Sequence, residues 1–168
     1  VIDITDCYEG LEGLTITVND GTININASDD GINAAGGTDS SGFGGFGHDA
    51  FSADSDANIY INGGTITISA DGDGIDSNGN LYVTGGGIYV SGPESSADGA
   101  LDYDGEATIT GGTLIAAGAS GMAENFGSDS TQGSILVTFT TQSAGTTISL
   151  LDEAGSTLLS WQSDKTYS

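Results

Sequence analysis

One ten-residue pattern occurs four times along the chain, and this repeat restricts the folds open to it more than any other feature. Each copy has a glycine near its centre, and the copies span residues 16–25, 59–68, 81–90 and 107–116. The central glycines, Gly21, Gly64, Gly86 and Gly112, are separated by 43, 22 and 26 residues. The longer first interval contains a Gly-rich insertion loop over 37–57. A period of a little over twenty residues is typical of a β-solenoid coil, whereas a propeller blade needs about 40.

Apolar residues alternate on both sides of each central glycine, as expected for two short strands joined by a bend. The inward positions hold Val18, Ile61, Val83 and Ile109 before the glycine, and Ile23, Ile66, Ile88 and Leu114 after it. One strand pair cannot bury such a face, but coils stacked about 4.8 Å apart place like side chains on one another. The pattern predicts an all-β fold, a right-handed single-stranded parallel β-helix (β-solenoid).

The length and the repeat predict a single β-helix domain over residues 1–168. Ile2 and Ile4 lie 21 residues before their equivalents in the next copy, so we expect the sequence to start inside a coil, as a fragment of a longer chain. Residues 134–168 keep the alternation but lack the glycine pair. This predicts C-terminal capping strands, a hairpin-like cap over an otherwise open sheet edge.

The chain is strongly acidic, with 24 Asp and Glu against one lysine, Lys165, and no arginine, and a formal net charge of -23. Nucleic acids and anionic membrane surfaces are therefore not expected as partners. No apolar run approaches the roughly 20 residues needed to cross a bilayer, so we expect no membrane insertion. The single cysteine, Cys7, excludes an internal disulfide.

Acidic residues recur in the turns after the strand pairs, in register with the glycines. The equivalent turns run from Glu9 to Glu12, Asp30 to Asn33, Asp73 to Asp76, Gly99 to Asp102 and Gly121 to Glu124. Their last residues are separated by 21, 43, 26 and 22 residues. Further acids lie beside them at Asp29, Asp71, Asp98 and Asp104. Stacking brings such carboxylates to about 4.8 Å, where two charges repel by roughly 3 kcal/mol at an effective dielectric constant of about 20.

Something must offset this repulsion. The basic side chains Lys165 and His48 lie outside the repeats, which indicates that protein cations do not offset it. Solvation, proton sharing and bound metal remain as explanations. Carboxylate, asparagine and turn carbonyl oxygens, without clustered His or Cys, suit Ca2+ better than zinc, copper or iron. We therefore expect several calcium ions in the stacked turns.

Aromatic residues offer a second kind of contact. Tyr60 and Tyr82 occupy the same outward position in two successive copies, which predicts an exposed stacked pair able to meet sugar rings. An ordinary surface tyrosine stack is an equally good interpretation. Tyr89, Phe43 and Phe46 are further candidate carbohydrate contacts, the two phenylalanines from the insertion loop. Trp161, by contrast, is expected to be buried in the C-terminal cap.

Five ordered motifs, at residues 8–13, 28–37, 73–79, 99–105 and 111–118, resemble a known family. They are similar to the bacterial carbohydrate-binding domain family first described as a domain of unknown function. The resemblance implies a secreted or cell-surface, calcium-containing parallel β-helix that is structurally similar to pectate lyases and binds cellulose and acidic sugars such as polygalacturonate. It maps the calcium-binding acids onto Asp30, Asp73, Asp76, Asp98, Asp102 and Asp104, with Glu9, Glu12 and Glu124 as further members. The turn pattern adds Asp29, Asn33 and Asp71.

The resemblance to pectate lyases does not extend to catalysis. Those enzymes abstract a proton next to a uronate carboxylate with a basic side chain, usually Arg or Lys, while calcium acidifies the carbon. This chain has no arginine, and Lys165 lies in the predicted cap. Metal-bound carboxylates are also unavailable as the general acid of a glycosidase. We expect no catalytic residues and a binding module in which calcium bridges the protein to uronate carboxylates.

Three alternatives remain at this point. A calcium-rigidified structural or adhesive solenoid would associate with other domains or copies through its ends. A pectate-lyase-like enzyme would need a base that the repeats do not supply. Ice binding through threonine ladders is disfavoured because tyrosines interrupt any flat threonine face.

Overall fold

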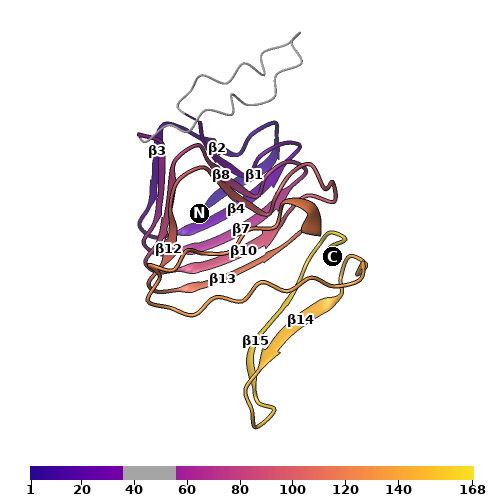
Figure 1. Ribbon diagram of the computed structural model, residues 1–168. Helices are drawn as coiled ribbons and strands as arrows, with labels where there is room; N and C mark the ends of the chain where they lie inside the picture. The colour runs from indigo at the N-terminus through magenta and orange to yellow at the C-terminus, as the bar shows by residue number, and fades with distance from the viewer. Residues whose placement is uncertain (36–55) are drawn as a thin grey trace.

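The computed structural model describes residues 1–35 and 56–168, and in this part of the chain the regular structure is almost entirely β (Figure 1). Strands that are far apart in the sequence lie side by side in three parallel sheets. We call them sheets A, B and C. The arrangement confirms the predicted all-β fold with stacked parallel strands and is compatible with a β-solenoid. No helix in the described residues is long and apolar enough to cross a bilayer.

The first four coils each contribute one strand to each sheet, and a fifth strand completes sheet A. Sheet A consists of β1 (Ile2–Cys7), β4 (Thr22–Ala27), β7 (Thr65–Ala70), β10 (Gly87–Ser91) and β13 (Thr113–Ala117). Sheet B consists of β2 (Leu11–Glu12), β5 (Ile32–Ala34), β8 (Ile75–Ser77) and β11 (Leu101–Tyr103). Sheet C consists of β3 (Thr15–Val18), β6 (Asn58–Ile61), β9 (Asn80–Val83) and β12 (Ala107–Ile109). The two strands predicted around each glycine bend therefore form, in sheets C and A, and each of the first four coils has a third short strand in sheet B.

The strand register follows the sequence alignment residue by residue. In sheet A, Ile23 pairs with Ile66, and Ile66 with Ile88. Ile2 pairs with Ile23 as the 21-residue spacing predicts. The inward columns form one core, in which Ile66 and Ile88 are fully buried. Stacked apolar columns therefore stabilise the coils both by burial and by the backbone hydrogen bonds between them.

The bend between sheets C and A depends on glycine. Gly21, Gly64, Gly86 and Gly112 all have positive φ, from 85° to 111°, a conformation that other residues rarely adopt. Each bend also lies close to the one below it, since a Cβ at Gly64 would come within 2.8 Å of the Gly21 carbonyl oxygen. The glycine column of the sequence thus marks a turn that every coil repeats.

The C-terminal region departs from the stack. After the 3-10 helix η1 (Ser120–Met122), the strands β14 (Thr147–Leu151) and β15 (Thr157–Gln162) form an antiparallel hairpin (Figure 1). The expected alternation over 135–139 forms no strand, and the Ile135 side chain is 68% exposed. The preceding residues are joined to β12 by backbone hydrogen bonds from Gly127 and Gln132, and the pairing of sheet C ends at β12. The predicted hairpin forms, but not every predicted capping strand does.

Candidate functional site

The turns between sheets A and B bring acidic residues of two successive coils together. The local sequence is Asp30-Gly-Ile-Asn33 in one coil and Asp73-Gly-Ile-Asp76 in the next. Glycine is needed inside these turns because the coils touch there: a Cβ at Gly31 would lie 2.5 Å from the carbonyl oxygen of Gly74. This close approach holds the acidic side chains that flank the glycines in one coil next to those of the adjacent coil.

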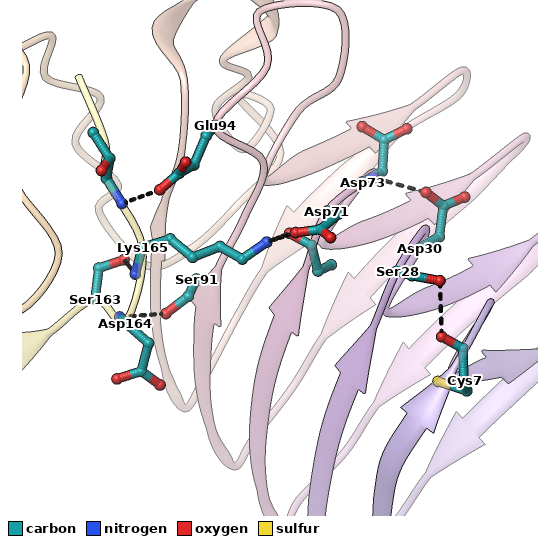
Figure 2. A network of polar contacts seen from close by, with 12 residues as sticks. Cys7, Ser28, Asp30, Asp71, Asp73, Ser91, Glu94, Ser163, Asp164 and Lys165 are labelled. Carbon is teal, nitrogen blue, oxygen red and sulfur yellow. Dashed lines mark hydrogen bonds and ion pairs between the residues drawn. The ribbon is translucent and has the colours of Figure 1, made fainter.

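Two of these carboxylates form a ladder from coil to coil. Asp30 Oδ1 accepts a hydrogen bond from the backbone N–H of Asp73 at 2.7 Å (Figure 2). Asp73 Oδ1 in turn accepts from the backbone N–H of Gly99 at 2.5 Å. Because position 99 is glycine, the ladder ends in the fourth coil. The carboxylates therefore hold successive turns together as well as adding charge.

One group of three carboxylates is compact enough to hold a metal ion. Carboxylate oxygens of Asp30, Asp73 and Asp76 all lie within 4.8 Å of one another. Asp30 and Asp76 are only 3% and 5% exposed, while Asp73 is half-buried. Their close burial requires a proton, a cation or an extended hydrogen-bond network to offset the charge.

Asn33 completes this cluster and supplies an independent sign of a ligand. It pairs in register with Asp76, and its Nδ2 donates to Asp30 Oδ2 at 3.1 Å. The Asn33 side chain is fully buried, yet its Oδ1 has no hydrogen-bond partner among the described residues. An orphaned buried acceptor is rare in folded proteins and is explained by an ion or water bound to it. We call Asp30, Asp73, Asp76 and Asn33 the buried acidic site.

The electrostatics of the buried acidic site centre on Asp30. Burial, and to a smaller extent the neighbouring carboxylates of Asp73, Asp76 and Asp29, raise the pKa of Asp30 to about 9. The hydrogen bond from the Asp73 backbone opposes this rise only in part. In the absence of a cation the site therefore retains a proton at neutral pH, whereas a bound cation would displace that proton.

The donor set fits calcium. Three carboxylates and an asparagine oxygen are hard ligands, and neither His nor Cys takes part. Calcium accepts six to eight oxygens at about 2.3 to 2.6 Å in irregular geometry, including backbone carbonyls and water. The residues present thus supply part of a calcium shell and match zinc or copper poorly.

The other predicted ligands are spread along the stack and do not join this group. Asp102 follows Asp76 in the register of sheet B, and Glu12 precedes Asn33. Glu12, Asp71, Asp104 and Glu124 are exposed, whereas Glu9, Asp29, Asp98 and Asp102 are half-buried. Within the described ranges 1–35 and 56–168, only the buried acidic site is tight enough to hold a metal ion. Several ions were expected, and one candidate centre is found there.

A second, looser cluster lies nearer the C-terminal end of the stack. It comprises Asp98, Asp102, Asp104 and Glu124, which we call the C-terminal acidic group. Burial raises the pKa of Asp102, with smaller contributions from the charges of Asp104 and Asp98. Burial likewise raises the pKa of Glu124, and the charges of Asp102 and Asp104 raise it to a smaller extent. These acids influence one another but remain more open to water than Asp30.

The only lysine lies closer to the acidic turns than its sequence position suggested. Lys165 Nζ forms an ion pair with Asp71 and donates to the Ala70 carbonyl oxygen (Figure 2). The backbone N–H of Asp164 donates to the Ser91 hydroxyl at 3.0 Å, and that of Thr166 to Glu94 at 2.8 Å. The expectation that no protein cation reaches the turns was wrong for Asp71, because a tail outside the repeat folds back over sheet A.

The candidate carbohydrate contacts occupy two different surfaces. The rings of Tyr60 and Tyr82 stack on sheet C, with centroids 5.2 Å apart and planes inclined by 15°, as the alignment predicted. Tyr89 lies in sheet A and packs against Trp161 of the hairpin at 6.4 Å. Trp161 is half-buried. Phe43 and Phe46 lie outside the described residues.

The Tyr89–Trp161 contact is a feature that sequence reasoning missed. The repeat locates Tyr89 on the outer face, but the partner comes from a hairpin that has no repeat equivalent.

Comparison of the chain with protein-family models, curated proteins and solved structures finds no significant match.

Proposed function

We propose that this chain is a non-catalytic, extracellular carbohydrate-binding module built on a right-handed parallel β-helix that calcium stabilises. The observation that carries the proposal is the stacked Tyr60–Tyr82 pair on an otherwise polar sheet face. Flat pairs of half-exposed rings suit the apolar faces of sugar rings. Thr17 and Thr108 continue the same column on either side and add hydroxyl groups.

Calcium has a structural role in this proposal. The buried acidic site lies between two coils, and the exposures of Asp30 and Asp76 leave little room for a polysaccharide to reach an ion there. An ion bound at Asn33 Oδ1 would satisfy the orphaned oxygen and offset the charge of three carboxylates. The resemblance stated above is the basis for proposing cellulose-type and polygalacturonate-type ligands and a secreted bacterial location.

The chemistry of the described residues supports binding over lyase catalysis. A β-elimination needs a base close to the carbon beside the uronate carboxylate. The chain has no arginine, and Lys165 is engaged with Asp71 and Ala70. The ammonium is therefore held by these contacts near sheet A, on a different sheet from the tyrosine pair.

Affinity electrophoresis tests the binding function. Wild-type protein is run in native gels containing hydroxyethylcellulose or polygalacturonate, with calcium or with chelator. We expect retardation by at least one polymer, and a several-fold weaker retardation for the variant Tyr60→Ala/Tyr82→Ala because each stacked ring contributes about 1 kcal/mol or more. Tyr60→Phe/Tyr82→Phe is the matched control, because it changes the same two positions and keeps both rings. Migration of wild-type protein unaffected by every polymer would overturn the proposal, and release of unsaturated products would overturn its non-catalytic part.

A structural or adhesive solenoid is the second candidate, and a specific observation favours considering it. Apolar side chains are exposed at both ends of the stack: Ile2 is 49% exposed in β1, and Leu136 and Val137 are each 51% exposed beyond β13. Large exposed apolar areas mark interaction surfaces. Sedimentation analysis over a range of protein concentrations distinguishes the two functions, since concentration-dependent chains of copies without polysaccharide binding would favour the structural one.

A further inference from the structure

A shallow trough on the outer face of sheet A has no role in the function proposed so far. It encloses about 400 Å3, and its side-chain lining comes from Thr5, Asn24, Asn26, Thr67, Ser69 and Asp164. We call this hollow the sheet A trough. It is separate from the tyrosine pair, which lies on sheet C.

The floor of the trough is a grid of polar groups. Asn24 pairs in register with Thr67, and Asn26 with Ser69, on adjacent strands. All four side chains point outward, because the residues between them are in the core. Neighbouring strands are about 4.8 Å apart, so amide and hydroxyl groups recur at a short, regular spacing.

Much of the hydrogen-bonding capacity of this floor is unused within the protein. Asn24 Nδ2 donates to Asp3 Oδ1 at 2.5 Å, and Asn26 Nδ2 donates to the Thr5 carbonyl oxygen at 3.4 Å. These contacts turn both amide nitrogens toward β1 and leave the amide oxygens for a ligand. In the described part of the chain, the hydroxyls of Thr67 and Ser69 form no hydrogen bond. The floor therefore offers two acceptors and two hydroxyls that both donate and accept.

The tail lines one side of the trough through Asp164, and the hairpin packs on the strand beside it. Tyr89 and Ser91 follow Thr67 and Ser69 in register on the next strand. Trp161 packs over Tyr89, and the Asp164 backbone binds Ser91. Figure 2 shows the Asp164 carboxylate pointing away from its contact with Ser91. The rim beside the polar floor thus holds a half-buried indole and a free acceptor.

The charge of the trough selects among ligand classes. No lysine lines it, and Asp164 lies at its rim, with Asp3 bound to Asn24 nearby. The whole chain carries a formal charge of -23, so an anionic ligand would be repelled. An apolar ligand would bury the hydroxyls and amide oxygens without partners. An uncharged ligand with many hydroxyls satisfies both conditions, and a ring with an apolar face can also contact Trp161.

We propose that the sheet A trough is a second saccharide site, which binds uncharged sugar rings through Asn24, Asn26, Thr67 and Ser69 with Trp161 at its rim. The inference rests on the proposed carbohydrate-binding function, but it uses residues other than the tyrosine pair. It divides the ligands by chemistry, because this site takes neutral sugars and excludes uronates.

Trp161 is the only tryptophan of the chain, and it packs on Tyr89 beside the trough floor, on a different sheet from Tyr60 and Tyr82. The full chain is titrated with cellohexaose, and in parallel with a galacturonic acid trimer, while tryptophan fluorescence is recorded. We expect a saturable change with cellohexaose and none with the acidic trimer. The variant Thr67→Val/Ser69→Ala removes two hydroxyls and should weaken the cellohexaose response by about tenfold. Thr22→Ala/Thr65→Val is the matched control, because it removes two hydroxyls from the same strands outside the trough.

The outcomes separate this inference from the proposed function. An equal response in Thr67→Val/Ser69→Ala and in Thr22→Ala/Thr65→Val overturns the trough, and so does a response only to the acidic trimer. A silent tryptophan together with polymer retardation that depends on Tyr60 and Tyr82 overturns the trough and leaves the proposed function intact. A silent tryptophan and no retardation by any polymer overturn both. Thermal melting of each variant confirms that it is folded.

Discussion

The buried acidic site and the C-terminal acidic group arise from the same repeat but differ in how the coils enclose them. Between the second and third coils, both turn positions carry an oxygen ligand: Asp30 faces Asp73, and Asn33 faces Asp76. In the fourth coil Gly99 replaces the first acid, and only Asp102 continues the column. The comparison shows that a compact site needs two successive coils with ligands at both positions, and burial by coils on either side.

Removal of calcium should produce the largest effect. An ion bound only to the folded state stabilises it by about 4 kcal/mol at a thousandfold excess over its dissociation constant. We therefore expect a chelator to lower the melting temperature by ten degrees or more, measured by calorimetry at low salt. An unchanged melting temperature with excess chelator would falsify the structural role of calcium.

Two conservative variants locate that effect in one of the two acidic clusters. Asp76→Asn removes a ligand charge from the buried acidic site, so it should weaken calcium binding by about tenfold or more. In chelator the same variant should melt higher than wild type, because the charge of Asp76 no longer acts on Asp30. Asp102→Asn is the control in the same column. A larger loss of calcium affinity for Asp102→Asn would move the site to the C-terminal acidic group.

Glycine substitutions test whether close packing of coils creates the buried site. A Cβ at Gly74 would lie 2.4 Å from the Ala100 carbonyl oxygen and 2.3 Å from a methyl group of Val90. Gly74→Ala should cost about 3 kcal/mol, since backbone and core must both shift. At Gly13 the nearest atom is 3.7 Å away, and Gly13→Ala should cost less than about 1 kcal/mol. Urea denaturation measures both, and equal losses would contradict the packing argument.

The pKa of Asp30 predicts how stability depends on pH when calcium is absent. Burial and neighbouring carboxylates raise this pKa from its ordinary value of 3.8 to about 9, so the folded state binds the proton more tightly than the unfolded state. Stability from this group is therefore greatest below about pH 4 and falls as the pH rises toward about 9. We expect calcium-depleted protein to be more stable at pH 5 than at pH 8, by on the order of 4 kcal/mol.

The variant Asp30→Asn isolates this titration. Its amide oxygen can still accept the hydrogen bond from the Asp73 backbone, but it carries no charge. The difference between pH 5 and pH 8, measured by urea denaturation in calcium-depleted buffer, should shrink markedly. Calcium should also flatten the wild-type dependence, because the ion displaces the proton. A slope that is the same in Asp30→Asn would assign the titration to other carboxylates.

The sequence predicts the stack well because its information is periodic. Ile23, Ile66 and Ile88 recur at one position of the repeat, and the pairing of their strands follows directly. The register of Asn33 with Asp76 was predictable for the same reason. Which acids become buried depends on how neighbouring coils cover them, and the alignment alone does not give this. A check for two successive coils with ligands at both turn positions would have selected Asp30 and Asp73.

The C-terminal region was harder to predict because its contacts have no repeat. Ile148 and Leu150 alternate as predicted and lie in β14, yet nothing in the alternation pairs Trp161 with Tyr89 or Lys165 with Asp71. Such contacts form between segments more than 70 residues apart and depend on how the hairpin folds back over sheet A.

Lys165→Met should have the smallest effect on stability. It removes the ion pair that lies just outside the buried acidic site. Its partner Asp71 has a side chain that is 68% exposed, so water screens the pair, and the loss of stability should be only about 0.5 kcal/mol. The tail keeps its backbone contacts to Ser91 and Glu94. Hydrogen exchange at Asp164 and Thr166 should therefore quicken only a few-fold, while calcium affinity stays unchanged. Lys165→Arg keeps the charge and is the control. A tenfold change in calcium affinity for Lys165→Met alone would show that the charges of Asp71 and Asp73 act together on the ion. The tail would then be part of the buried acidic site.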